Sequence, residues 1–318
     1  MTLEKLNCLI IDEMYPNIGE LLIDAGVTPD YQPDINRESV IKKIGAYEGL
    51  VVRSKTIVDR ELLLAASKLQ FIARAGAGLD QIDEDECASR GIQIFNAPEA
   101  NCSAVGEHAV GMLLTLFNKI NIGDRQIRQG IWEREDNRGF EIQGKTIGII
   151  GFGNMGQAFA ERLSGFECQI LAYDKHRVGF GSILVNEVSL DEVFEKTDIL
   201  SLHTPLTPET YGMINLAFIE KFSNDITLIN TSRGKIVVLR DLIEALNIGK
   251  VKSAALDVLE NENIDQLSKD EQVYFNDLIK RENVLLSPHV AGWTFESYEK
   301  INVILAAKIK KYINSLTN

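Results

Sequence analysis

The chain has 318 residues, of which 45% are hydrophobic and 25% are charged, an ordinary composition for a globular protein long enough for two domains. Its formal net charge of −13 argues against binding to nucleic acid or anionic membranes, because both require a basic surface. Four scattered cysteines without a C-x-x-C pair argue against a metal site or a disulfide framework. No signal-like leader or run of about 20 apolar residues occurs, so we expect a cytoplasmic protein.

Short apolar runs alternate with amphipathic stretches along the chain, which is the pattern of β-α units. In the first block, expected strands cover 8–11, 49–52, 71–73 and 92–95, and expected helices cover 18–25 and 61–67. A strongly apolar helix is then expected over 103–117, followed by a polar stretch over 118–144. Further apolar runs cover 146–150, 169–173, 199–202, 227–229, 252–256 and 284–286, and a last amphipathic helix is expected over 298–316. Runs this apolar fit strands that are buried on both faces of a parallel sheet, so the sequence predicts an α/β protein.

A glycine-rich turn follows the first apolar run of the second block. It has the form G-x-G-x-x-G and includes Gly151, Gly153, Asn154, Met155 and Gly156. Such glycines permit a tight turn and a close approach to a pyrophosphate, which the N-terminus of a helix attracts. Asp174 follows the next run, where a carboxylate binds ribose hydroxyls and repels a 2′-phosphate, so NAD is expected rather than NADP. The basic residues 175–177 either soften that preference or are solvated loop charges.

Polar residues stand just after several expected strands, at the sheet edge where open α/β proteins bind ligands. In chain order they are His203, Thr204 and Pro205, then Asn230 to Gly234, then Asp257 with Glu260 and Glu262, and finally His289. Reduction of a 2-keto acid needs a proton donor near neutral pH, which a histidine beside a carboxylate supplies. An arginine binds the planar carboxylate of the substrate and polarises its carbonyl. The pattern therefore predicts hydride chemistry, with His289 as the best proton donor.

These residues also have structural interpretations. His108 lies inside the apolar helix and is expected to pack there, and His203 is expected to shape the cofactor loop. Glu260, Glu262 and Asp265 also fit a solvated acidic loop.

Several motifs together carry a resemblance to a known family. They are Val52-Arg53-Ser54, the segment Arg74 to Asp80, the glycine turn, the segments 203–207 and 230–234, Leu256-Asp257-Val258, and Ser287-Pro288-His289. Over nearly its whole length the chain resembles the D-isomer-specific 2-hydroxyacid dehydrogenases. The resemblance implies two doubly wound parallel-sheet domains, with an NAD-binding Rossmann domain over 101–290 inserted into a flavodoxin-like substrate domain made of 1–100 and 291–318. It also implies a small 2-hydroxy acid or 2-keto acid as substrate, a site in the interdomain cleft, a last helix that returns to the first block, and a homodimer.

The same resemblance implies roles for individual residues. Arg233 binds and polarises the substrate, His289 is the acid/base, and Glu262 is its carboxylate partner. Cofactor contacts are implied at the glycine turn, Asp174, His203, Thr204, Pro205, Thr231, Ser232, Gly292 and Asp257, the last at the nicotinamide end. Substrate contacts are implied at Arg53, at Ser54 and at the backbone amides of Ala75, Gly76 and Ala77.

The substrate is open to more than one interpretation. Trp132-Glu133-Arg134, with Arg53 and Arg74, resembles the phosphoglycerate branch of the family, where an arginine near position 134 reaches the neighbouring subunit's site. This favours oxidation of D-3-phosphoglycerate in serine biosynthesis, without a regulatory domain. The alternatives are reduction of glyoxylate, hydroxypyruvate or another 2-keto acid, and a non-catalytic NAD sensor, which would not need a proton donor. Asn263 stands where the family usually has proline, so Glu260 is a second candidate partner for His289.

Overall fold

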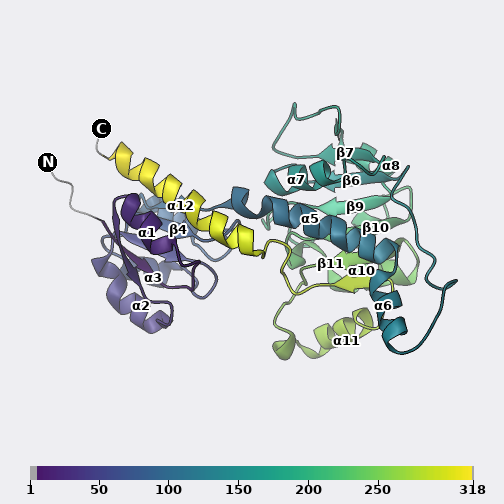
Figure 1. Cartoon of the computed structure of the whole chain (residues 1–318), viewed down its shortest axis with the longest axis horizontal. Helices are drawn as coiled ribbons and strands as arrows, with labels where there is room; N and C mark the ends of the chain where they lie inside the picture. Colours follow the sequence, from purple (N-terminus) through teal and green to yellow (C-terminus); the bar gives the residue numbers. More distant parts are fainter. Residues whose placement is uncertain (1–5, 317–318) are drawn as a thin grey trace. The chain divides into compact units, whose positions relative to one another are not determined.

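The computed structural model describes residues 6–316, and residues 1–5 and 317–318 of the predicted first domain lie outside this part. The chain divides into two compact units (Figure 1). The first unit contains the chain up to Asn101 and the segment from Trp293 onward, and the second unit is Cys102–Gly292. The predicted domain boundaries, 100/101 and 290/291, fall one and two residues before the observed ones.

The first unit is built on a five-stranded sheet in the order β2-β1-β3-β4-β5, in which all paired strands are parallel. This is the flavodoxin-like order. Its strands are β1 (Leu6–Ile10), β2 (Val27–Tyr31), β3 (Gly49–Val52), β4 (Phe71–Arg74) and β5 (Gln93–Phe95). Its helices are α1 (Ile18–Asp24), α2 (Arg37–Lys43), η1 (Ile44–Ala46), α3 (Arg60–Ala65), α4 (Glu84–Ser89) and α12 (Phe295–Ser315), with the first residues of α5 (Pro98–Phe117).

Alternate residues of each strand feed separate cores on the two faces of this sheet. On one face, Ile10 and Val51 pack with α1 and with the apolar stripe of α12, which includes Leu305. On the other face, Leu9 and Leu50 pack with α2, α3 and α4. The last helix thus returns to the first block, as the family resemblance implies.

The second unit is built on a seven-stranded sheet in the order β12-β11-β10-β9-β6-β7-β8, again with parallel pairs throughout. Its strands are β6 (Thr146–Ile150), β7 (Gln169–Tyr173), β8 (Asn186–Glu187), β9 (Ile199–Leu202), β10 (Ile226–Asn230), β11 (Val251–Leu256) and β12 (Val284–Leu286). Its helices are α6 (Ile120–Arg128), α7 (Asn154–Arg162), α8 (Leu190–Lys196), α9 (Leu216–Ile219), η2 (Gly234–Ile236), α10 (Leu239–Asn247), η3 (Ile264–Gln266) and α11 (Lys269–Leu278), besides most of α5.

This sheet also has a core on each face. Ile147 and Ile149 of β6 pack with α5 and α7, and Leu200 and Leu228 pack with α8, α9 and α10 on the opposite face. The order of the strands reverses at β6, because β7 lies on one side of it and β9 on the other. Ligands of open α/β sheets bind at such a switch point, beyond the carboxyl ends of the strands.

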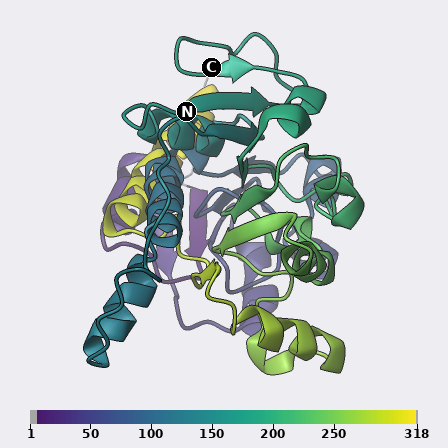
Figure 2. The ribbon, with the colours of Figure 1, turned by 90° about the vertical axis from the view of Figure 1, so that its right-hand side faces the viewer.

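The predicted fold class of two parallel-sheet α/β domains is confirmed. Several elements have no counterpart among the predicted ranges, and three of them show why. The edge strand β2 contains Pro29, which an edge position tolerates, while α6 and α11 lie in stretches interpreted as polar or acidic. Figure 2 shows α6 projecting from the rest of the second unit. Within residues 6–316, no helix is both long and apolar enough to cross a membrane.

Candidate active site

The glycine turn connects β6 to α7. Gly151 has a φ of 90°, and a Cβ atom there would lie 2.6 Å from the carbonyl oxygen of His203, so this position requires glycine. At Gly153, by contrast, a Cβ would meet nothing within 4 Å. Asn154, Met155 and Gly156 form the first turn of α7. The turn therefore presents an open face at the N-terminus of a helix, which is the geometry that accommodates a pyrophosphate.

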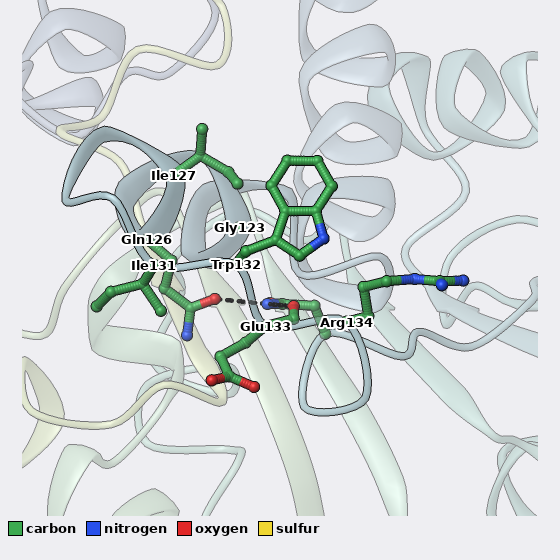
Figure 3. Close-up of a pocket in the computed structure, with 8 residues that line it drawn as sticks. Gly123, Gln126, Ile127, Ile131, Trp132, Glu133 and Arg134 are labelled. Atoms are coloured by element: carbon green, nitrogen blue, oxygen red, sulfur yellow. Dashed lines mark hydrogen bonds between the residues drawn. The ribbon is translucent and has the colours of Figure 1, made fainter.

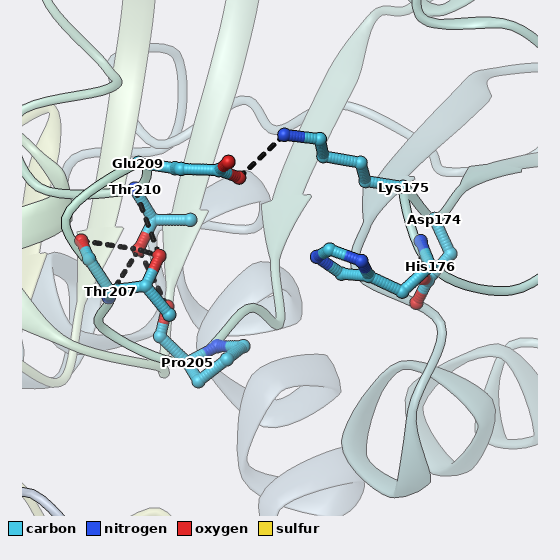
Figure 4. Close-up of polar contacts among 7 residues, drawn as sticks. All are labelled: Asp174, Lys175, His176, Pro205, Thr207, Glu209 and Thr210. Atoms are coloured by element: carbon cyan, nitrogen blue, oxygen red, sulfur yellow. Dashed lines mark hydrogen bonds and ion pairs between the residues drawn. The ribbon is translucent and has the colours of Figure 1, made fainter. Parts of the chain in front are cut away.

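Asp174 follows β7 and reaches back to the glycine turn. Its Oδ2 accepts a 2.7 Å hydrogen bond from the amide of Phe152, and its Oδ1 accepts one of 2.9 Å from the amide of His176. The ammonium of Lys175 is paired at 2.6 Å with Glu209 on the neighbouring loop (Figure 4). Because Lys175 is exposed and already paired with Glu209, the contact favours the interpretation of Lys175 as a solvated loop charge over a role in cofactor preference.

The loop after β9 begins with a buried histidine, and the residues that follow are more exposed. His203 is 8% exposed, its Nε2 lies 2.8 Å from the Ser201 hydroxyl, and burial lowers its pKa to about 3. The ring is therefore neutral at physiological pH and is no proton donor there. Among the described residues, three buried atoms of this sheet edge have no hydrogen-bond partner: Nδ1 of His203, Oγ1 of Thr204 and Oγ1 of Thr231.

Those three orphaned atoms bear on whether a dinucleotide fits. A buried polar group without a partner costs free energy, so its persistence is consistent with a ligand that completes it. Pro205 continues the same loop, where its carbonyl accepts from Thr210 at 2.7 Å (Figure 4). The open glycine turn, the carboxylate of Asp174 and these orphaned atoms lie at the carboxyl ends of β6, β7, β9 and β10, and together they fit NAD.

The loop after β10 holds Arg233. Asn230 organises this loop, because its Oδ1 accepts from both the amide and the hydroxyl of Ser232 at 3.1 and 2.8 Å, and its Nδ2 donates to the Arg233 carbonyl at 3.0 Å. One guanidinium nitrogen of Arg233 donates to the Ser232 carbonyl at 2.8 Å. The pKa of His289 is raised by its hydrogen bond with Glu262, and the charge of Arg233 opposes that rise, so the guanidinium and the imidazole belong to one electrostatic environment.

His289 and Glu262 form an ion pair. Nδ1 of the imidazole lies 2.9 Å from Oε2 of Glu262, with both side chains about half exposed. The hydrogen bond with Glu262 raises the pKa of His289, against the opposing effects of burial and of Arg233. Glu260, the second candidate, instead accepts from the amide of Leu239 at 2.9 Å. Since Nδ1 is occupied, Nε2 is the ring atom left for a substrate.

The backbone of His289 is strained, with a φ of 55° that is uncommon for a residue with a side chain. Asp257 holds this turn: its carbonyl accepts from the His289 amide at 2.8 Å, and its carboxylate accepts from the amides of Val290 and Ala291 at 3.0 and 2.9 Å. The Ser287 hydroxyl donates to the same carboxylate at 2.6 Å. Burial alone raises the pKa of Asp257, but hydrogen bonds with His108 and Ser287, and then with the two backbone amides, outweigh it and lower the pKa to about 2.

Asp257 is only 2% exposed, so its carboxylate anchors the loop before Gly292, and its predicted contact with the nicotinamide end stays a prediction.

The interpretation of His108 as a packing residue is wrong. Its Nε2 lies 3.0 Å from the Ser287 hydroxyl and 3.5 Å from Asp257 Oδ1, so α5 contributes a polar side chain to the same cluster. An isolated histidine in an apolar helix gives no sequence signal for such a contact.

In the first unit, the predicted substrate residues follow β3 and β4. Asp12, which the sequence analysis did not single out, accepts hydrogen bonds from the amides of Arg53, Ser54 and Lys55 at 2.7, 3.4 and 3.1 Å. The only available signal was a carboxylate just beyond the first strand.

The predicted cradle of three amides needs a correction. The amide of Ala75 donates to the Val52 carbonyl at 2.8 Å, and that of Gly76 donates to the Arg74 carbonyl at 2.9 Å. The parallel ladder between β3 and β4 continues past the end of the strand and occupies the first of these donors. Only Ala77 keeps an amide that makes no hydrogen bond within the described residues.

Arg134 lies on the loop after α6. Beside it is a small surface cavity of about 290 Å³ lined by Ile127, Ile131 and Trp132. The loop is tied down by Asn137, which donates to Gln126 Oε1 at 2.5 Å and to the Glu133 carbonyl at 2.7 Å. Figure 3 shows the Arg134 side chain extending away from that hydrogen bond. Neither Arg233 nor His289 is among the residues that line this cavity.

The comparisons with known proteins agree with this geometry. Residues 110–291 match the model of the D-isomer specific 2-hydroxyacid dehydrogenase, NAD binding domain. A D-3-phosphoglycerate dehydrogenase of Archaeoglobus fulgidus is 38% identical over 89% of the chain and 53% of its own length. A hydroxypyruvate reductase of Thermotoga maritima is 36% identical over 87% of the chain and 88% of its own length.

Among solved structures, a D-lactate dehydrogenase from Aquifex aeolicus complexed with NAD and lactic acid has a TM-score of 0.82 and 27% identity, covering 97% of this chain and 96% of its own. The fold is that of a Rossmann-type dinucleotide-binding domain combined with a flavodoxin-like domain. The chain belongs to the D-isomer specific 2-hydroxyacid dehydrogenase family. It spans about half the length of the phosphoglycerate dehydrogenases that it matches.

Proposed function

We propose that this protein is an NAD-dependent D-2-hydroxyacid dehydrogenase whose substrate pair is D-3-phosphoglycerate and 3-phosphohydroxypyruvate. The observation that carries the proposal is the His289–Glu262 pair, which leaves Nε2 of the imidazole available in the electrostatic environment of Arg233. An acid/base beside a guanidinium is what interconversion of a 2-hydroxy acid and a 2-keto acid requires.

The chemistry assigned to the chain is a proton transfer matched to a hydride transfer. The glycine turn and Asp174 would hold NAD, which would supply the hydride acceptor for oxidation at C2 and, in its reduced form, the hydride donor for reduction. In oxidation, neutral His289 removes the proton of the C2 hydroxyl through Nε2. In reduction, the protonated ring returns that proton to the carbonyl oxygen. Glu262 stabilises the imidazolium, and Arg233 holds the substrate carboxylate and polarises the C2–O bond.

The substrate is assigned from charge. In the first unit, Arg53 and Arg74 stand at the ends of neighbouring strands, and guanidinium groups bind phosphate as well as carboxylate. A phosphoglycerate dehydrogenase among the relatives agrees with this assignment. The hydroxypyruvate reductase that matches over 88% of its own length supports a second candidate, in which the substrate lacks the phosphate.

One comparison separates these two candidates. Consumption of NADH is followed with 3-phosphohydroxypyruvate, hydroxypyruvate, glyoxylate and pyruvate. We expect the highest kcat/KM with the phosphorylated acid, and higher efficiency with hydroxypyruvate would reverse the assignment. The His289→Ala variant controls for background oxidation. Tight NADH binding without turnover on any of the acids would instead indicate an NAD sensor.

We also propose a homodimer formed through α6 and the loop that follows it. Its exposed apolar side chains include Ile127, Trp132 and Phe140, with exposures of 53, 77 and 67%, an unusual concentration for a surface that faces only water. Trp132→Glu is expected to shift the protein toward monomer in sedimentation equilibrium. Val273→Glu, on the surface of α11 with 64% exposure, is the matched control and leaves the oligomeric state unchanged. If neither variant changes the mass, this segment is no dimer contact.

A further inference from the structure

An aromatic cluster in the first unit holds the side chain of Arg53. The guanidinium carbon lies 3.7 Å from the ring centroid of Trp293 and 5.5 Å from that of Tyr298. The two rings contact each other, with centroids 4.9 Å apart. Arg53 follows β3, whereas Trp293 precedes α12 and Tyr298 lies in its first turns, so the cluster joins segments about 240 residues apart in the sequence.

Two members of this cluster, Tyr298 and Arg53, are fixed by further contacts. The hydroxyl of Tyr298 donates to the Glu13 carbonyl at 2.7 Å, and its ring meets Tyr15 edge-on with centroids 6.0 Å apart. The backbone of Arg53 is held by the buried carboxylate of Asp12, which accepts the amides of three successive residues. Both the backbone and the side chain of Arg53 are therefore restrained.

Stacking itself uses none of the N–H donors of the guanidinium, and Arg53 additionally makes a side-chain hydrogen bond with Tyr298. A cation–π contact uses the face of the group, whereas its N–H donors point outward from the edge and can bind an anion in a bidentate manner. An arginine whose rotamer is already selected loses less conformational entropy when it binds. The restrained side chain is thus suited to a small oxyanion.

We propose that Trp293 and Tyr298 are positioning residues that hold Arg53 ready for the phosphate or carboxylate of the substrate. Asp12 sets the backbone from which this arginine extends. The inference rests on the proposed function only in naming the substrate as the source of the anion, and inorganic phosphate serves as a probe that needs no turnover.

The affinity of the intact protein for inorganic phosphate is measured by calorimetry with four variants. Arg53→Gln is expected to remove the binding. Trp293→Leu is expected to weaken it about 2- to 30-fold, the range of a cation–π contact, while Trp293→Phe keeps an aromatic face and recovers part of the loss. Arg60→Gln is the matched control, because it removes a guanidinium of the same unit that is paired with Glu86 outside the cluster.

Two further readouts separate positioning from general stability. With 3-phosphohydroxypyruvate, Trp293→Leu is expected to raise KM by the same factor and to leave kcat within about twofold. Trp132 and Trp293 are the two tryptophans, so in Trp132→Phe the emission reports Trp293 alone, and Arg53→Gln is expected to change it.

The inference is overturned if Trp293→Leu binds phosphate as tightly as the parent, or if Arg53→Gln leaves phosphate binding intact. If phosphate binding follows the expected order but none of the keto acids is reduced, the positioning role stands and the proposed function fails.

Discussion

The carboxylate of Asp257 offers the sharpest test of how the catalytic loop is held. The pKa of Asp257 is about 2, against an ordinary value of 3.8. The ionised carboxylate is therefore more stable in the folded protein than in the unfolded chain. Taking 1.36 kcal/mol per pKa unit, this carboxylate stabilises the folded protein by about 2 kcal/mol at neutral pH. Because the pKa is lowered, the contribution is fully present above about pH 4 and is lost as the pH falls toward 2, with about half gone by pH 3.

Asp257→Asn removes the charge while nearly keeping the shape. Asparagine retains one acceptor oxygen, so the amides of Val290 and Ala291 and the Ser287 hydroxyl no longer all find a partner. An unsatisfied buried donor costs about 1–3 kcal/mol, which agrees with the value from linkage. We therefore expect a loss of about 2–4 kcal/mol at pH 7 and a clearly smaller loss at pH 3.

The assay is urea unfolding at both pH values, followed by circular dichroism, together with hydrogen exchange at residues 290 and 291. Asp124→Asn is the control, because it breaks an exposed pair with Arg128 on α6 and is expected to leave the midpoint unchanged. An unchanged midpoint for Asp257→Asn at pH 7 would refute the assignment of Asp257 as the loop anchor. An equal loss at both pH values would refute the electrostatic part of the reasoning.

Four further predictions concern turnover and the cofactor. His289→Ala is expected to lower kcat by about 10²–10⁴-fold in stopped-flow assays with NADH binding retained. Arg233→Ala is expected to raise KM and lower kcat together, as steady-state kinetics would show, because one guanidinium serves binding and polarisation. Since Glu262 raises the pKa of His289, Glu262→Gln is expected to move the alkaline loss of reductase activity to lower pH, and an unmoved pH profile would contradict the pairing. Asp174→Ala is expected to weaken NAD binding and to improve NADP relative to it, measured by the ratio of the two Kd values.

Much of this architecture could be predicted from local patterns. Buried parallel strands are apolar on both faces, so β6, β9 and β10 stand out in the sequence without any knowledge of their partners. The edge strand β2 contains proline and aspartate because it pairs on only one side, and its composition therefore carries no strand signal. The acidic stretch after Glu262 contains α11, whose capping box at Ser268 and Glu271 was the available signal.

The candidate site was predictable only in part, for a related reason. Parallel topology brings the carboxyl ends of the strands to one edge, so residues such as Arg233 and His289 could be grouped from their positions alone. The contacts that orient them depend on side chains distant in the sequence: Ser287 meets His108 from α5, and Arg53 stacks on Trp293. Spacing within a strand or helix says nothing about such pairs.

Backbone geometry explains why these unpredicted contacts matter for the chemistry. His289 adopts a left-handed conformation that costs roughly 1–2 kcal/mol for a residue with a Cβ, so the loop would relax if it were held by local sequence alone. Asp257 offsets that cost with its carbonyl and both carboxylate oxygens, and it stands at the end of β11, whose pairing with β10 and β12 is fixed by the sheet. The sheet thus holds Asp257, Asp257 holds the turn, and the turn directs the His289 ring toward Glu262. The acid/base residue is therefore positioned by a buried carboxylate that need not touch the substrate. For that reason, the stability of Asp257→Asn and its dependence on pH test the mechanism as directly as turnover does.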